Sequence, residues 1–224
     1  MNLRGIIFDM DGVLCDSEAF ISEAACRMFA ELGVQVQPED FRPFVGTGED
    51  RFLGGVAEKH GVKLDLPVGK ARTYAIYQEI IRGRLQPMNG VRGFVDACRA
   101  RGLRMAVASS ADEVKVTANL AEIGLPLALF DAVINGLMVT RKKPEPDIFL
   151  LAAERMGVPA TACLVLEDAP SGLRAARAAG CAALGVRSSF DDATLRAAGA
   201  SWTVKDLAEA SGLLPSILEG CDCE

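Results

Sequence analysis

Apolar and polar positions from about residue 90 onward follow two alternating patterns. Short apolar runs indicate buried strands, and longer stretches with apolar residues three or four positions apart indicate helices. Strands that alternate regularly with helices predict a parallel sheet wrapped by helices, a doubly wound α/β fold. The predicted strands span residues 6–8, 103–109, 130–135, 162–166 and 181–186, and the predicted helices of this part span residues 91–101, 111–123, 144–156 and 170–179.

The stretch from Ser17 to Pro87 breaks this alternation, because it carries helical periodicity without a strand-like run. Ser17 suits the N-cap position of the first helix, with Glu18 in its first turn. A helical block after the first strand predicts a small helical unit inserted into the sheet domain. The predicted helices span residues 17–32, 49–60 and 67–84, and the predicted domains are residues 1–16 with 88–224, and residues 17–87.

The first predicted strand ends in two aspartates one residue apart, Asp9 and Asp11, followed by Gly12. Burial of a carboxylate beside apolar residues is unfavourable unless a cation or hydrogen-bond donors compensate for it. The pair therefore predicts a metal site or a catalytic site. The strand period of two points both side chains to one side, but the turn at Gly12 means that the loop sets their relation. The alternative is a polar turn that caps a helix.

Three further strand or loop ends carry polar groups. Ser109 and Ser110 end one strand, Lys143 stands directly before a proline that is predicted to start a helix, and Glu167 and Asp168 end another strand. Ligands of open parallel sheets bind beyond the carboxyl ends of the strands, where all these positions fall. Two alternatives remain open: Lys143 as a surface lysine among charged neighbours, and the acidic pair as a favourable start of a helix.

Composition limits the classes of partner. The chain has 224 residues, half of them hydrophobic, which is enough for a sizeable core. A net charge of −6 argues against nucleic acid or an anionic membrane as a partner, although a local positive pocket for a phosphate stays possible. No apolar run reaches about 18 residues, and the N-terminus leads into a strand without a signal peptide. We expect a cytoplasmic monomer.

The seven cysteines are odd in number and form no CxxC pair, which predicts reduced thiols. Cys221 and Cys223 form a CxC at the C-terminus, which is either a soft-metal site or a frayed tail. Cys15 follows the two aspartates and is either a redox-sensitive group or a small apolar filler.

Taken together, the four motifs resemble those of the haloacid dehalogenase (HAD) superfamily in type and order, over essentially the whole chain. The resemblance implies a Rossmann-like hydrolase core, with the inserted helices as the small helical cap of the first cap class. The motifs are DMDGVL at residues 9–14, followed by Asp16 and Ser17, LRMAVASS at 103–110, KKPEPDIF at 142–149 and CLVLEDAPSG at 163–172.

This resemblance implies catalytic roles for four residues. Asp9 would be the nucleophile that forms an aspartyl-phosphate. Asp11 would act as general acid and then general base. Ser109 would donate a hydrogen bond to the phosphoryl group, with Ser110 beside it as a substrate contact, and Lys143 would neutralise the nucleophile and the phosphate.

The resemblance also implies a magnesium site. Mg²⁺ prefers oxygen ligands, and it keeps several of its waters when a protein binds it. The implied ligands are Asp9, the backbone carbonyl of Asp11 and Asp168, with Glu167 close by or bound through water. Without a cation, carboxylates clustered in this way would repel one another and their pKa values would rise.

The loop at residues 44–49 would face the substrate, with Gly46 and Thr47 as contacts; the alternative is a solvated turn. Residues 46–57, GTGEDRFLGGVA, resemble the HAD module of plant suppressor-of-quenching proteins. The β-phosphoglucomutases have an arginine for a second phosphate where this chain has Glu49. They also have a histidine where this chain has Phe20 and Ile21.

The residues and the resemblance together predict a Mg²⁺-dependent phosphatase of a small phosphorylated metabolite, with a sugar phosphate as a candidate. One alternative is a mutase similar to β-phosphoglucomutase, which Glu49 disfavours. The other is a binding or regulatory module that has lost catalysis. The second alternative is disfavoured because the chain has all of Asp9, Asp11, Ser109, Lys143 and Asp168.

Overall fold

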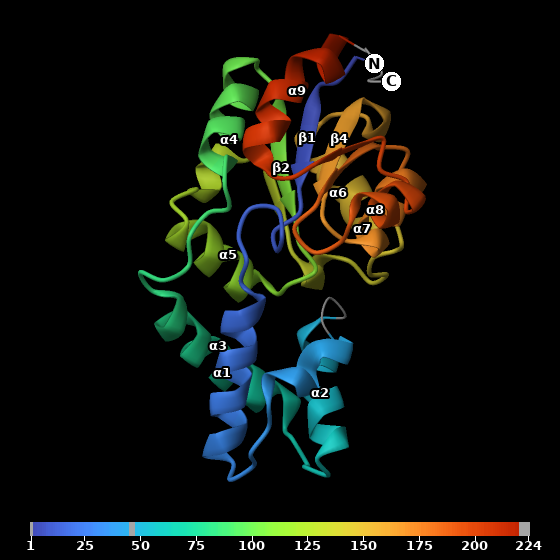
Figure 1. The fold of residues 1–224 in the computed structure, drawn as a ribbon. Helices are drawn as coiled ribbons and strands as arrows, with labels where there is room; N and C mark the ends of the chain where they lie inside the picture. The colour runs from blue at the N-terminus through green and yellow to red at the C-terminus, as the bar shows by residue number, and fades with distance from the viewer. Residues whose placement is uncertain (1, 45–47, 220–224) are drawn as a thin grey trace.

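The structure, a computed structural model, describes residues 2–44 and 48–219. Its parallel sheet has six strands, namely β1 (Gly5–Phe8), β2 (Arg104–Ala108), β3 (Ala132–Ile134), β4 (Cys163–Glu167), β5 (Ala182–Val186) and β6 (Trp202–Val204). Their order is β3-β2-β1-β4-β5-β6, and helices cover both faces (Figure 1). The predicted doubly wound parallel sheet is therefore confirmed. Strand β6 was not predicted, because a run of three residues is too short to show a period.

Strand β1 lies in the middle of the sheet, and all four of its residues are buried. Phe8 at its end pairs in register with Val107 of β2 and Leu166 of β4. Because these neighbours run parallel, the residues that follow them leave the sheet at one edge. Asp9 and Glu167, each one position further along, therefore lie beside each other at the carboxyl edge of the sheet.

One face of the sheet is covered by α4 (Val91–Ala100), α5 (Glu113–Glu122) and α9 (Leu207–Glu219), and the other by α6 (Asp147–Met156), α7 (Pro170–Ala178) and α8 (Asp192–Ala197). Neighbouring residues of β1 face opposite sides, as a period of two requires. Phe8 packs edge to face against Phe94 of α4, with ring centroids 5.9 Å apart. Ile7 belongs to the other apolar layer, together with Phe149 of α6. Both layers hold β1, and hence Asp9, in a fixed position.

Between β1 and α4 the chain forms α1 (Glu18–Glu31), the 3₁₀ helix η1 (Pro38–Phe44), α2 (Glu49–Lys59) and α3 (Leu66–Ile81). Figure 1 shows these helices together beyond the carboxyl edge of the sheet, with α1 continuing from the chain that leaves β1. Helix α3 reaches the sheet domain, where the Tyr77 hydroxyl donates a hydrogen bond to Asn119 of α5. The division of the chain at residues 16 and 87 stays a prediction. Within residues 2–44 and 48–219, no helix has the length and apolar content to cross a membrane.

The helix predicted to start at Pro144 begins later, at Asp147. Residues 142–145 form a turn instead, in which the Glu145 N–H donates to the Lys142 carbonyl over 2.9 Å. A residue that precedes a proline is disfavoured in the helical conformation, which explains why Glu145 before Pro146 lies outside the helix. The prediction was wrong at this boundary, and the turn, rather than a helix start, positions Lys143.

Candidate active site

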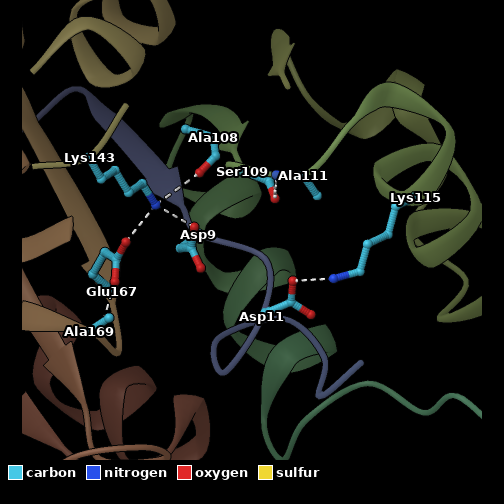
Figure 2. A network of polar contacts seen from close by, with 9 residues as sticks. All are labelled: Asp9, Asp11, Ala108, Ser109, Ala111, Lys115, Lys143, Glu167 and Ala169. Carbon is cyan, nitrogen blue, oxygen red and sulfur yellow. Dashed lines mark hydrogen bonds and ion pairs between the residues drawn. The ribbon is translucent and has the colours of Figure 1, made fainter. Parts of the chain in front are cut away.

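Three buried acidic residues, Asp9, Glu167 and Asp168, follow or end the strands β1 and β4 at the carboxyl edge. One oxygen of each lies within 4.8 Å of the others. Lys143 reaches them from the turn before α6, with its Nζ 2.5 Å from Asp9 Oδ1 and 2.5 Å from Glu167 Oε1 (Figure 2). The Lys143 side chain is only 7% exposed, so Lys143 is a buried lysine and not a surface lysine.

The electrostatics of this cluster favour an additional cation. Burial raises the pKa of Asp9 well above its ordinary value, and the opposing effect of Lys143 does not cancel this. Burial, together with the nearby Glu167, raises the pKa of Asp168 to about 7. One ammonium group therefore leaves the three carboxyl groups short of positive charge. A set of clustered carboxylate oxygens matches the ligands that Mg²⁺ prefers, so these residues fit the predicted metal.

Two glycines allow the acidic side chains their positions. A Cβ on Gly12, whose φ is +78°, would lie 2.0 Å from Asp168 Oδ2. A Cβ on Gly172 would lie 1.7 Å from Glu167 Oε1. The glycines of the first and last motifs thus serve close packing against the carboxylates.

Asp11 lies apart from this cluster. Its Oδ2 is 2.9 Å from Nζ of Lys115 on α5 (Figure 2). Its Oδ1 accepts a hydrogen bond from Ser17 Oγ. Ser17 occupies the predicted N-cap position of α1, but its side chain makes no capping hydrogen bond, because its hydroxyl binds Asp11 instead. The turn after Met10 therefore gives the two aspartates different partners.

Lys115 was not identified from the sequence. It is 5% exposed, and Asn119, one helical turn further along, is fully buried. Burial lowers the pKa of the Lys115 ammonium, but Asp11, Tyr77 and Glu49 outweigh this and raise the pKa above its ordinary value. The only signal in the sequence was two polar residues four positions apart on the inner face of a predicted helix, which is a weak signal.

The two predicted serines lie at the end of β2. Ser109 is buried, and its Oγ accepts a hydrogen bond from the Ala111 N–H over 3.2 Å. Its backbone N–H donates to the Ile134 carbonyl of β3. These contacts hold the Ser109 hydroxyl beside the acidic cluster. Both serines line a cavity at this edge of the sheet.

A cavity of about 840 Å³ lies between the carboxyl edge and the inserted helices. Of the predicted substrate contacts, Gly46 and Thr47 lie outside the described residues. Every residue predicted for catalysis or metal binding lines this cavity, and all of them come from the sheet domain. The inserted helices add apolar and acidic side chains. The lining includes Asp9, Asp11, Ser109, Ser110, Lys115, Lys143, Glu167 and Asp168 from the sheet domain, and Glu18, Ile21, Phe44, Glu49 and Phe52 from the inserted part.

Glu49 contributes a carboxyl group to this cavity from the start of α2. Its Oε2 is buried and has no hydrogen-bond partner among the described residues, and burial raises the pKa of this carboxyl group. Arg51 on α2 and Arg72 on α3 form ion pairs elsewhere, with Glu58 and Glu31 respectively. The inserted part therefore brings the acidic Glu49, and neither of these two arginines, to the cavity.

The cysteines of the described residues are free thiols. Cys15 is fully buried, and burial raises the pKa of its thiol well above the ordinary value. A buried thiol of this kind reacts slowly, so the environment favours the small apolar filler over the redox-sensitive group. Cys221 and Cys223 lie outside the described residues.

A doubly wound sheet with an acidic cluster and a buried lysine at its carboxyl edge defines the chain as a Rossmann-like α/β enzyme. Residues 3–180 match the family model of haloacid dehalogenase-like hydrolases, and the chain belongs to this family. The family and the hydrolase class predicted from the four motifs are thereby confirmed.

The relatives are hydrolases and related proteins. The chain is 44% identical over 216 residues to SUPPRESSOR OF QUENCHING 1, chloroplastic, of Arabidopsis thaliana, over 93% of this chain but 20% of that protein. It is 37% identical over 185 residues to the fructose-1-phosphate phosphatase YqaB of Escherichia coli (strain K12), over 82% of this chain and 96% of YqaB. A crystal structure of a CbbY variant from Rhodobacter sphaeroides with xylulose-(1,5)bisphosphate has a TM-score of 0.81 at 27% identity, over 92% of this chain and 96% of that one. Since the Arabidopsis protein is chloroplastic, the cytoplasmic location stays a prediction, as does the monomer.

Proposed function

We propose that the chain is a Mg²⁺-dependent phosphatase that hydrolyses the phosphate ester of a small sugar-like metabolite through a phosphorylated Asp9. The observation that carries this proposal is the Asp9 carboxylate, paired with Lys143 at 2.5 Å and lining a cavity that Asp11 and Ser109 also line. The fructose-1-phosphate phosphatase and the sugar bisphosphate complex among the relatives support the substrate class. In this proposal residues 17–87 act as the cap over a core formed by residues 1–16 and 88–224.

The reaction has two displacements at phosphorus. A carboxylate oxygen of Asp9 attacks, the bond from phosphorus to the ester oxygen breaks, and that oxygen leaves with the electron pair and takes a proton from Asp11. Water then attacks the phosphoryl group and gives a proton to Asp11, and the bond to Asp9 breaks, which regenerates the carboxylate. Ser109 donates a hydrogen bond to a phosphoryl oxygen, and Lys143 balances charge on Asp9 and on the phosphoryl group.

In this proposal Asp9 and Asp168, with the backbone carbonyl of Asp11, would hold the metal, and Glu167 would lie next to them. When bound, Mg²⁺ supplies positive charge to the phosphoryl oxygens. Asp9 and Glu167 both pair with Lys143. Asp168, the third acidic residue of the cluster, makes no ion pair within the described part of the chain.

A screen of phosphorylated metabolites with phosphate release as the readout tests the activity. Fructose 1-phosphate and 6-phosphogluconate belong in the screen because relatives are named for acting on them. We expect release of phosphate from at least one sugar or sugar-acid monophosphate, and none with Asp9→Asn. If no ester in a broad screen with Mg²⁺ were hydrolysed, the enzyme proposal would give way to a binding or regulatory module.

The mutase alternative predicts a different outcome. A mutase must hold a second phosphate through a cation, and at the corresponding position Glu49 presents a carboxylate that repels a dianion. We therefore expect negligible conversion of β-glucose 1-phosphate to glucose 6-phosphate in a coupled assay primed with glucose bisphosphate. Strong flux would contradict the phosphatase assignment. Arg174, which lines the cavity and makes no polar contact within the described residues, would then be the cation to replace.

A further inference from the structure

The two aspartates of the first motif are held by two different buried lysines. Lys143 pairs with Asp9 and Glu167, whereas Lys115 pairs with Asp11, and Figure 2 shows the two ammonium groups on opposite sides of the loop that carries both aspartates. Two carboxylates only two residues apart thereby acquire separate environments. Such a separation is what an enzyme needs when one carboxylate must attack and the other must transfer protons.

The position of Lys115 is coupled to the phosphate end of the cavity. Helix α5 starts at Glu113, a few residues after Ser109, so Lys115 lies in its first turn. Side chains in a helix lean toward its N-terminus, which directs Lys115 back to the carboxyl edge of the sheet. The buried Lys115 side chain has Asp11 as its ion-pair partner among the described residues.

Asp11 is fixed at two points by these contacts. Ser17 donates to Oδ1, and Lys115 lies 2.9 Å from Oδ2. Each carboxylate oxygen has two lone pairs, so a lone pair remains free on either oxygen to hold a transferred proton. Without Lys115, the Ser17 hydroxyl would be the remaining side-chain partner of Asp11 among the described residues, and one neutral contact holds a carboxylate less firmly than this contact and an ion pair together.

We propose that Lys115 is a positioning residue that holds the Asp11 carboxyl group toward the leaving-group side of the cavity and apart from the Asp9–Lys143 pair. The inference rests on the proposed function and adds to it a residue that acts through Asp11. It goes beyond the four motifs, because Lys115 belongs to none of them.

The test uses two kinds of leaving group. The kcat/KM of an aspartyl-phosphate mechanism reports steps up to release of the leaving group. An alkoxide needs a proton from Asp11, whereas p-nitrophenolate leaves without one. In Lys115→Met we expect kcat/KM for the sugar phosphate found in the screen to fall by about 10- to 100-fold. The kcat/KM for p-nitrophenyl phosphate should stay within about threefold.

A double-mutant cycle shows whether Lys115 acts through Asp11. In the Asp11→Asn background, adding Lys115→Met should cause no further loss with the sugar phosphate, because the group being positioned is already inactive. Lys70→Met is the matched control, because Lys70 pairs with Asp112 at the start of α5 but makes no contact with Asp11. We expect this control to leave the ratio of the two kcat/KM values unchanged.

Several outcomes would overturn the inference. These are equal losses with both substrates, an unchanged or higher kcat/KM for the sugar phosphate, or full additivity with Asp11→Asn. If Lys115→Met does not fold, Lys115→Gln keeps a polar group at the buried position and gives the same comparison. A wild-type enzyme that hydrolyses neither substrate would contradict the proposed function itself, which distinguishes the two failures.

Discussion

The carboxyl edge of the sheet and the inserted helices both carry ion pairs, but they differ in burial. At the edge, Lys143 lies 2.5 Å from Asp9, with side chains 7% and 11% exposed. On the inserted helices, Arg72 lies 2.7 Å from Glu31, with side chains 47% and 48% exposed. Exposed pairs contribute little to stability because water and salt screen them, whereas buried charges depend on their partners. Pairs of similar length therefore belong to a buried charge cluster in one region and to a solvated surface in the other.

The largest expected difference comes from removing one carboxylate in each region. Asp9→Asn should lower turnover by at least about a thousandfold, because a neutral amide oxygen is a far weaker nucleophile than a carboxylate. Asp50→Asn on α2 removes an exposed partner of Lys70 and should leave kcat within about twofold. Phosphate release measures both, and circular dichroism checks folding. Retention of more than a few per cent of activity by Asp9→Asn would exclude the covalent mechanism.

Metal removal should affect only the carboxyl edge. Dialysis against EDTA should abolish phosphate release and Mg²⁺ should restore it, because the cluster of Asp9, Glu167 and Asp168 is short of positive charge. Calorimetry gives a readout without turnover, in which Asp168→Asn should weaken Mg²⁺ binding by more than about tenfold. Full turnover in metal-free buffer would contradict the magnesium site.

Two glycines with the same backbone conformation sharpen the comparison. Gly12 and Gly33 have φ of +78° and +77°, but a Cβ on Gly12 would collide with Asp168, whereas a Cβ on Gly33 meets nothing within 4 Å. Both alanine variants should lose about 1 kcal/mol of stability from the left-handed conformation. Gly12→Ala should in addition lose most activity, as measured by phosphate release alongside thermal unfolding. Equal activity of the two variants would show that the position of Asp168 does not matter.

The smallest effect is expected on the inserted helices. Arg72→Ala removes the exposed pair with Glu31 and should change kcat/KM by less than about twofold, because Arg72 does not line the cavity. Kinetics with the substrate from the screen provide the measurement. A large rise in KM would mean that Arg72 leaves Glu31 and reaches the substrate.

Much of the fold could be predicted because the periodicity of apolar residues, which marks helices and strands, can be seen along short stretches of sequence. The sequence placed Asp9, Ser109 and Glu167 at strand ends, and parallel pairing brings such ends to one edge. Prediction was wrong where neighbours along the chain competed. The start of α6 lies beyond Pro146 rather than at Pro144. Ser17 does occupy the predicted N-cap position of α1, but its hydroxyl binds Asp11 rather than the helix backbone.

The sequence by itself indicated the parallel α/β sheet and the acidic motifs, because both depend on residue type and spacing over short distances, and the family resemblance implied the hydrolase class. Only the tertiary structure decided which cation serves which carboxylate. Lys115 and Asp11 are 104 positions apart, and nothing local to either residue indicates the pair. The loop after β1 and the start of α5 bring them together. Because both groups are then largely removed from water, each charge requires the other as its partner.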